Sequence, residues 1–235
     1  MPKSADTLVA ATAATLMVVG CGRTGSEQVA TENISADIIA FADPSEDITL
    51  VSALLTDNGE AMNFSGNDVL RATADGIELV LVPNAEDEAD ETYSRQFDFA
   101  VDGGEIVVSL ERTRDAGAPS TLVAMPEVFA LVDFTEAQSR SEEIVLTWTP
   151  ASADPMDVSI DGDCLQDAFE AVIEDPLSGS YAVPADSLVV TQDSGDVCLV
   201  DVLVNRTKAG SLDPAYADGS VSGQVWRTLR VETKT

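Results

Sequence analysis

The sequence predicts an all-β protein built as two tandem β-sandwich domains. Three observations support this. Short segments alternate apolar and polar residues, turn-forming residues separate them, and long helical periods are almost absent. About two hundred of the 235 residues follow a distinctive N-terminal stretch, a length that suits two domains of about a hundred residues each.

The first element in the chain is a charged start followed by the twelve-residue apolar segment Leu8–Val19. Twelve helical residues span about 18 Å, which is too short for a hydrocarbon core of about 30 Å. The length therefore favours an export signal over a membrane-spanning helix, and residues 1–20 are predicted to be a signal peptide.

The apolar segment ends in Val18-Val19-Gly20-Cys21. These residues resemble the lipobox of bacterial lipoproteins, in which two aliphatic residues and a small residue precede a cysteine. The resemblance implies that the chain is cut before Cys21 and that this cysteine carries the lipid. Gly22 stands where an aspartate would retain such a protein at the inner membrane. The resemblance therefore implies a lipid-anchored protein of the cell envelope, at the outer membrane of a Gram-negative bacterium.

The cysteine count agrees with this compartment. The chain has three cysteines, Cys21, Cys164 and Cys198. If Cys21 carries lipid, the other two are left to form a disulfide, which an oxidising compartment favours. The bridge would close a loop of about 35 residues, for which chain entropy gives an upper-end stabilisation of about 4 kcal/mol. Two free thiols are the alternative.

Residues 21–33 are predicted to be the lipidated cysteine and a flexible tether, because the residues after Cys21 are small and polar. The two sandwich domains are assigned to residues 34–136 and 142–235. The boundary falls in the polar run 135–142, which contains no aliphatic side chain beyond one alanine.

Within the first domain, apolar residues at 97, 99 and 101 and at 106, 108 and 110 flank the turn sequence Asp102-Gly103-Gly104, which predicts a β-hairpin. Residues 165–176 fit either a three-turn helix or an irregular strand. The other predicted strands are Ile48–Leu55, Ile77–Val82, Val128–Phe134, Ile144–Trp148, Val197–Val204 and Gln224–Val231.

Two further patterns favour sandwich domains. Leu110–Gly117 and Val204–Gly210 share the order Arg-Thr, a basic residue, then Ala-Gly, which suggests a duplicated domain. Trp148 together with a Cys164–Cys198 bridge resembles the tryptophan over a disulfide of immunoglobulin-like domains. In that family the tryptophan lies between the cysteines, whereas Trp148 precedes both. As a whole the chain is similar to bacterial lipoproteins with immunoglobulin-like domains, which implies no inherited activity.

The charge excludes one class of partner. The formal net charge is −30, and a surface so acidic repels nucleic acid and anionic membranes. Such acidity is common in organisms of salty water. The chain has no histidine, so serine–histidine and cysteine–histidine nucleophiles and histidine-containing zinc sites are excluded. No nucleotide-binding motif is present. We therefore predict no enzyme activity and no cofactor.

Three groups of residues remain as candidate sites. The acidic run 86–91 and the aspartates at 157, 161 and 163 could bind calcium, although neither has EF-hand spacing. Several aromatic residues could form a sugar-binding platform, although packing is the favoured interpretation. Six basic residues are interpreted as neutralising nearby carboxylates, with a patch for an acidic partner as the alternative. The aromatic residues are Tyr93, Tyr181, Tyr216 and Trp226, and the basic residues are Arg112, Arg114, Arg206, Lys208, Arg227 and Arg230.

The sequence therefore predicts a non-enzymatic, lipid-anchored envelope protein that acts as a binding or structural module. Its expected partners are the membrane, through lipid on Cys21, and an envelope protein or polysaccharide. The first alternative is a carbohydrate-binding or adhesive module, and the second is a carboxylate-based hydrolase with two close acids in a cleft.

Overall fold

The computed structural model describes residues 24–84, 92–191 and 195–234. The predicted signal peptide, Cys21 and the acidic run 86–91 lie outside these residues. The described chain is all-β, as predicted, and three short 3-10 turns are its helical elements: η1 (Ser26–Gln28), η2 (Thr31–Asn33) and η3 (Pro176–Ser178).

The strands follow one another along the chain in two groups. The first group comprises β1 (Thr24–Gly25), β2 (Ile34–Asp43), β3 (Ile48–Asp57), β4 (Glu60–Asn63), β5 (Val69–Ala74), β6 (Ile77–Val80), β7 (Val82–Pro83), β8 (Tyr93–Phe97), β9 (Glu105–Glu111) and β10 (Ala118–Ala124). The second group comprises β11 (Ala130–Leu131), β12 (Gln138–Ser139), β13 (Ile144–Thr149), β14 (Met156–Asp161), β15 (Phe169–Ile173), β16 (Ser180–Val183), β17 (Val197–Ala209) and β18 (Asp218–Lys234).

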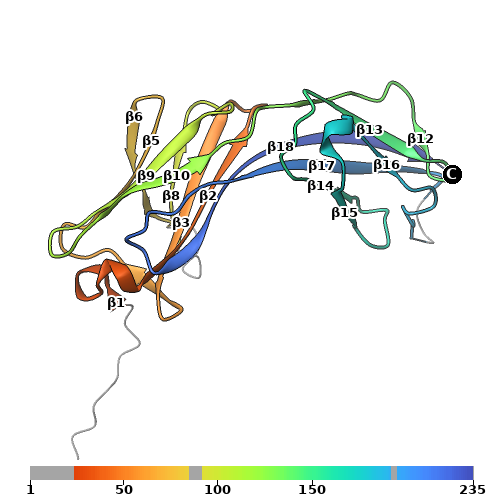
Figure 1. Cartoon of the computed structure of the whole chain (residues 1–235). Coiled ribbons are helices and arrows are strands. Elements are labelled where there is room, and N and C mark those ends of the chain that lie inside the picture. Colours follow the sequence, from red (N-terminus) through yellow and green to blue (C-terminus); the bar gives the residue numbers. More distant parts are fainter. Residues whose placement is uncertain (1–23, 85–91, 192–194, 235) are drawn as a thin grey trace, which may run out of the picture.

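One large sheet runs through both groups of strands. Its order is β1-β4-β3-β2-β18-β17-β14-β15, with β8 paired to β3 and β12 paired to β18. The long hairpin of β17 and β18 joins the two halves, because the first half of β18 pairs in parallel with β2 while its second half pairs only with β17 and β12. Figure 1 shows this hairpin extending from one end of the molecule to the other.

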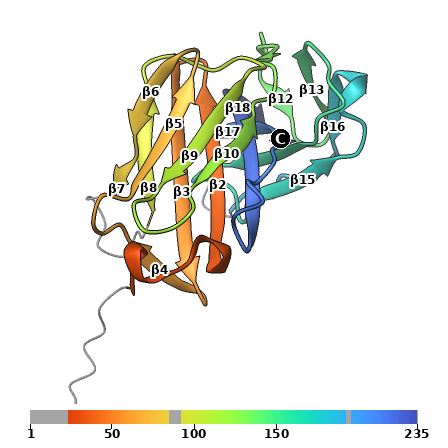
Figure 2. The same ribbon diagram turned by 60° about the vertical axis from the view of Figure 1, so that its left-hand side comes forward.

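Two smaller sheets cover the same side of the large sheet. The sheet β10-β9-β5-β6 packs on the first half, as Figure 2 shows, and β11-β13-β16 packs on the second half. The covered side carries the apolar alternation that the sequence predicts, such as Ile34, Ala36 and Ile38 in β2, each at most 2% exposed. Gly223 of β18 allows β10 to approach closely, since a Cβ there would lie 2.3 Å from the carbonyl oxygen of Ala124.

The other side of the large sheet is not covered in the same way. None of the outward-facing side chains of β2, β17 and β18 is fully buried. Each half is therefore a two-sheet sandwich, and the two sandwiches share one continuous sheet with an open face.

Several sequence predictions differ from the structure. Residues 97–110 do not form a hairpin: β8 pairs with β3 in the large sheet, whereas β9 pairs with β5 and β10 in the small one. Apolar alternation shows that both are half-buried strands, but it does not determine which sheet each strand joins.

Residues 169–173 form a strand, so the helical alternative for 165–176 is wrong. Of the predicted strand 128–134, Ala130–Leu131 forms a strand, and the Val132 amide adds one backbone hydrogen bond to Thr147.

The predicted boundary at 135–142 is crossed by packing and pairing. Gln138 and Ser139 form β12 against β18, and Arg140 is 6% exposed and donates to Thr233 Oγ1. Residues 218–225, which the sequence assigns to the second domain, pair in parallel with Ser35–Ala42 of β2 in the first. The polar segment is therefore not a linker, because Arg140 is buried in the second sandwich and Gln138–Ser139 pair with β18.

Candidate functional site

The segment that follows the predicted anchor is folded against the first sandwich, so the prediction of a flexible tether is wrong for residues 24–33. β1 pairs in parallel with Met62 and Asn63 of β4. Ser26, Val29 and Thr31 are 1%, 7% and 2% exposed. Small polar side chains, which are typical of linkers, here make buried hydrogen bonds. We call residues 24–33 the N-terminal segment.

Arg112, just past the end of β9, holds this segment in place. Its side chain is 1% exposed, and its Nε lies 3.2 Å from Asp68 Oδ2. Its Nη1 donates to Thr31 Oγ1 (2.8 Å) and Asp115 Oδ2 (3.3 Å), and its Nη2 donates to the carbonyl oxygens of Ser26 and Val29. All five guanidinium donors are thus engaged. We call Arg112, Asp68, Asp115, Ser26 and Thr31 the Arg112 network.

The two carboxylates of the network also bind backbone and hydroxyl groups. Asp68 accepts from Ser26 Oγ (2.9 Å) and from the Thr113 amide (3.1 Å). Asp115 accepts from the Thr31 amide at 2.6 Å. Hydrogen bonds from the Thr31 and Ala116 amides, assisted by Thr31 Oγ1 and the charge of Arg112, lower the pKa of Asp115 below its ordinary value.

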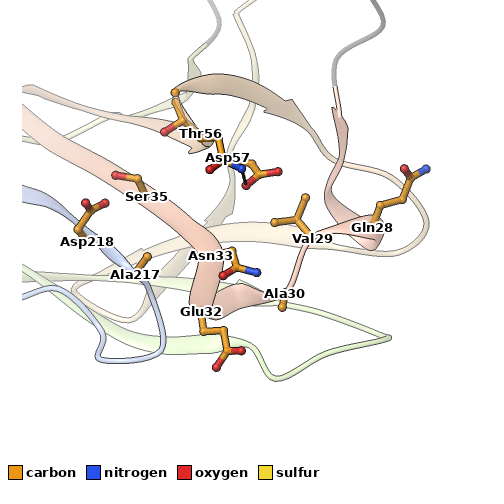
Figure 3. A pocket seen from close by; sticks show the side chains of 12 residues that line it. Gln28, Val29, Ala30, Glu32, Asn33, Ser35, Thr56, Asp57, Ala217 and Asp218 are labelled. Atoms are coloured by element: carbon orange, nitrogen blue, oxygen red, sulfur yellow. Dashed lines mark hydrogen bonds between the residues drawn. The ribbon is translucent and has the colours of Figure 1, made fainter.

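An open hollow of about 780 Å³ lies beside the N-terminal segment, lined also by the β3–β4 turn, by Ala217 and by Asp218 at the start of β18. Figure 3 shows its three acids, Glu32, Asp57 and Asp218, spread around the opening. The side-chain amide of Asn58 donates to Asp57 at 2.9 Å. The hollow therefore offers an acidic rim but no close pair of carboxylates for hydrolysis.

The predicted disulfide is present between Cys164 and Cys198, with a Cα–Cα distance of 5.8 Å. It does not match the immunoglobulin pattern suggested by Trp148. Cys164 follows β14 and Cys198 lies on β17, and these strands are neighbours in the large sheet, whereas the immunoglobulin bridge joins two sheets. Trp148 is 3% exposed and donates to the carbonyl oxygen of Pro176 at 3.3 Å.

The six basic residues do not gather into one patch. Arg112 and Arg206 are buried, whereas Arg114 pairs with Glu27 (3.3 Å) and Arg230 with Asp201 (3.8 Å) at exposed positions. Arg227 Nε donates to the carbonyl oxygen of Phe129 at 2.7 Å. Their interpretation as neutralising groups holds for Arg112, Arg114 and Arg230, but Arg206 and Arg227 bind backbone carbonyl groups instead.

Arg206 lies where the chain passes from the first sandwich to the second. It is fully buried, donates to the carbonyl oxygens of Glu127 (3.1 Å) and Pro150 (2.7 Å), and stacks 4.6 Å from the centre of the Phe129 ring. Burial lowers its pKa below the ordinary value, an effect that Asp154 and Glu127 partly oppose. Among the described residues its Nε has no hydrogen-bond partner. We call these contacts the Arg206 junction.

Two of the four predicted aromatic candidates are packed in the core. Tyr93 and Tyr216 are 3% and 6% exposed, and Tyr181 is half-buried. Trp226 is 39% exposed and lies against Phe41, with ring centres 5.8 Å apart and planes tilted by 34°. Sequence analysis did not single out Phe41, because nothing local indicates that β2 and β18 are neighbours.

The described residues can be compared with the requirements of a metal site and of a membrane-spanning helix. Within residues 24–84, 92–191 and 195–234, no group of three or more Cys, Asp or Glu side chains is placed to hold a metal ion. The acidic run 86–91 lies outside them. The same described residues contain no helix with the length and apolarity needed to cross a membrane.

Comparison with known proteins leaves the family open. No protein-family model and no curated protein matches the sequence. Among solved structures, the FN1–FN3 domains of chicken CNTN1 match at 11% identity and a TM-score of 0.31, covering 85% of this chain and 66% of that one. A cytokine receptor complex matches at 10% identity and a TM-score of 0.32, covering 84% and 95%. Similarities this low do not establish a shared function.

Proposed function

We propose that this protein is a lipid-anchored module of the cell envelope and that Cys21 holds it to the membrane. Its role there would be to bind other envelope components or to keep them at a fixed distance. The observation that carries the proposal is the sequence Val18-Val19-Gly20-Cys21 directly after a twelve-residue apolar segment. A catalytic role has no comparable support.

The position of the N-terminal segment adds a geometric consequence. Only Gly22 and Arg23 separate Cys21 from Thr24, so the anchor would lie within about 11 Å of β1. β1 is at the opposite end of the molecule from the C-terminal end of β18 (Figure 1). The first sandwich would therefore stand next to the bilayer, and the second would project away from it.

The charge of the protein supports attachment by lipid. An acidic protein of net charge −30 gains nothing from an anionic bilayer surface. Two or more acyl chains anchor a protein stably without any electrostatic help. Membrane association should therefore resist high salt.

The test is fractionation of cells that produce the Cys21→Ser variant. The native protein should sediment with membranes, resist a 1 M salt wash and incorporate labelled fatty acid, whereas the variant should do none of these. Cys164→Ser is the matched control, since it removes a cysteine without touching the anchor and should stay in the membrane fraction. Persistent salt-resistant sedimentation of Cys21→Ser would overturn the proposal.

A further inference from the structure

The open face of the large sheet carries an uncharged region across five strands. One row of side chains crosses β8, β3, β2, β18 and β17: Gln96 is opposite Leu50, Leu50 opposite Phe41, Phe41 opposite Gln224, and Gln224 opposite Thr207. Each of the five is next in sequence to at least one buried residue, which indicates that its side chain points away from the two covering sheets. The row contains apolar and neutral polar side chains only.

The next row has the same character. Ser94, Ser52, Ile39 and Ser222 lie opposite one another in the same order of strands. On the other side of the first row, Trp226 lies opposite Asn205. We call these two rows, with Trp226 and Asn205, the uncharged face.

The lack of charge is notable in this chain. Charged residues make up 23% of the sequence and the net charge is −30, yet the uncharged face has none. Acids return at its borders, at Asp37 and Asp43 on β2 and at Asp157 on β14. The Asp201–Arg230 pair lies further along the hairpin. A charged ligand would meet no countercharge on this face, and a polyanion would be repelled by the surroundings.

The side chains of the face suit a ligand rich in hydroxyl groups. Phe41 and Trp226 form an aromatic pair, and Trp226 and Leu50 are 39% and 38% exposed. Aromatic rings offer a large apolar surface at low conformational cost, and the C–H faces of sugar rings stack on such surfaces. Gln224 and Thr207 each carry both donor and acceptor groups, which matches sugar hydroxyls that donate and accept.

A second copy of the chain fits the face poorly. Five strands at about 4.8 Å spacing give a width of about 24 Å, and three rows span about 14 Å, or roughly 340 Å². A stable protein interface needs about 800 Å² on each partner. Two copies would also bring net charges of −30 together. A narrow, flexible and uncharged polymer chain needs neither an interface of 800 Å² nor opposite charges on the protein.

We infer that the uncharged face binds a neutral polysaccharide, with its sugar rings stacked on Phe41 and Trp226 and its hydroxyls bonded to Gln224 and Thr207. This inference rests on the proposed function, because it names the ligand class of the binding module. It does not depend on the lipid, so the two can fail separately.

The test is affinity electrophoresis of the detergent-solubilised full chain in native gels that contain hydroxyethyl cellulose, dextran or galactomannan, with alginate as the anionic comparison. At least one neutral polysaccharide should slow the native protein, and alginate should not. Trp226→Ala and Phe41→Ala should each weaken the retardation about tenfold. Gln224→Leu, which removes the amide donor and acceptor from the face, should also weaken it.

Val172→Ala is the matched control, because Val172 is 70% exposed on β15 of the same sheet but lies outside the face. It should bind like the native protein, and thermal melting should show that all four variants are folded. Failure of all three neutral polysaccharides, or unchanged binding by Trp226→Ala, would overturn the inference. A dimer in sedimentation that Trp226→Ala dissociates would assign the face to a second copy and also overturn it. Membrane anchoring by Cys21 would stand in each of these cases.

Discussion

Two buried arginines hold this protein together in different ways, one beside the N-terminal segment and one between the sandwiches. Arg112 is surrounded by two carboxylates, a hydroxyl and two carbonyl groups, and all its donors are used. Arg206 has no carboxylate within salt-bridge distance among the described residues and rests on two carbonyl groups and the face of Phe129. The first site compensates buried charge with opposite charge, whereas the second compensates it with dipoles and a ring.

The difference determines what each arginine contributes. Removing one partner of a buried ion pair leaves the other charge unpaired, which typically costs about 3–5 kcal/mol. Removing an arginine whose partners are all neutral leaves no unpaired charge behind and also relieves the burial of a charge. We therefore expect the N-terminal segment to depend on its arginine more than the junction does.

The largest effect is expected for Arg112→Ala. This change leaves Asp68, whose side chain is 1% exposed, without its ion pair, and removes the donors to Ser26 and Val29. The free energy of unfolding should fall by about 3–5 kcal/mol. Urea unfolding measures this, and limited proteolysis should show faster cleavage within residues 24–33.

Arg114→Ala is the control for that experiment. Arg114 is 68% exposed and pairs with Glu27 beside the same segment, so its loss should change stability by less than about 1 kcal/mol. If Arg112→Ala were as stable as Arg114→Ala, the Arg112 network would not hold the segment.

The two arginines also show how far the sequence could predict this fold. Arg112 and Arg206 occupy the same position of the repeated sequence Arg-Thr, a basic residue, Ala-Gly. The first copy connects β9 to β10, and the second ends β17 before the chain returns as β18. Strand positions such as 48–55 and 144–148 follow from local alternation and were predicted well. The surroundings of the arginines could not be predicted, because their partners lie far away along the chain, as Ser26 and Val29 do for Arg112 and Glu127 and Pro150 for Arg206.

The same limit explains the errors about the tether and the domain boundary. Ser26, Thr31 and Arg140 belong to residue types that are usually solvated, and they are buried here because distant groups satisfy their hydrogen bonds. The uncharged face was hidden for a similar reason. It exists only because β18 returns to pair with β2, and no local pattern predicts a pairing across about 180 residues.

A smaller loss is expected for Arg206→Met at the junction. Methionine keeps an unbranched apolar chain over Phe129 but leaves the carbonyl oxygens of Glu127 and Pro150 without their donors. Each buried unsatisfied group costs about 1–3 kcal/mol, and removal of a buried guanidinium with an unpaired Nε offsets part of this. We expect a net loss of about 1–2 kcal/mol in urea unfolding, below that of Arg112→Ala.

The junction variant should also alter the relation of the two sandwiches. Small-angle scattering should detect a broader distribution of end-to-end distances for Arg206→Met than for the native chain, while Arg112→Ala should leave it unchanged. If Arg206→Met lowered the free energy of unfolding as much as Arg112→Ala or more, pairing with carboxylates would not explain the difference between the two arginines.

The smallest and most selective effect is expected from acid. The folded-state pKa of Asp115 lies below its ordinary value because of the amides of Thr31 and Ala116. Its stabilising contribution is therefore present above the unfolded pKa of about 3.9, and it is lost as the pH falls through the folded value. The acceptors at the Arg206 junction are backbone carbonyl groups, which do not titrate. Hydrogen exchange at pH 5, 4 and 3 should show the N-terminal segment losing protection before residues 203–207 of β17 do, whose backbone groups pair with β14 and β18 around Arg206. Asp115→Asn should weaken this dependence on pH, because an amide cannot be protonated in this range, and equal loss of protection at both sites would show that acid does not distinguish them.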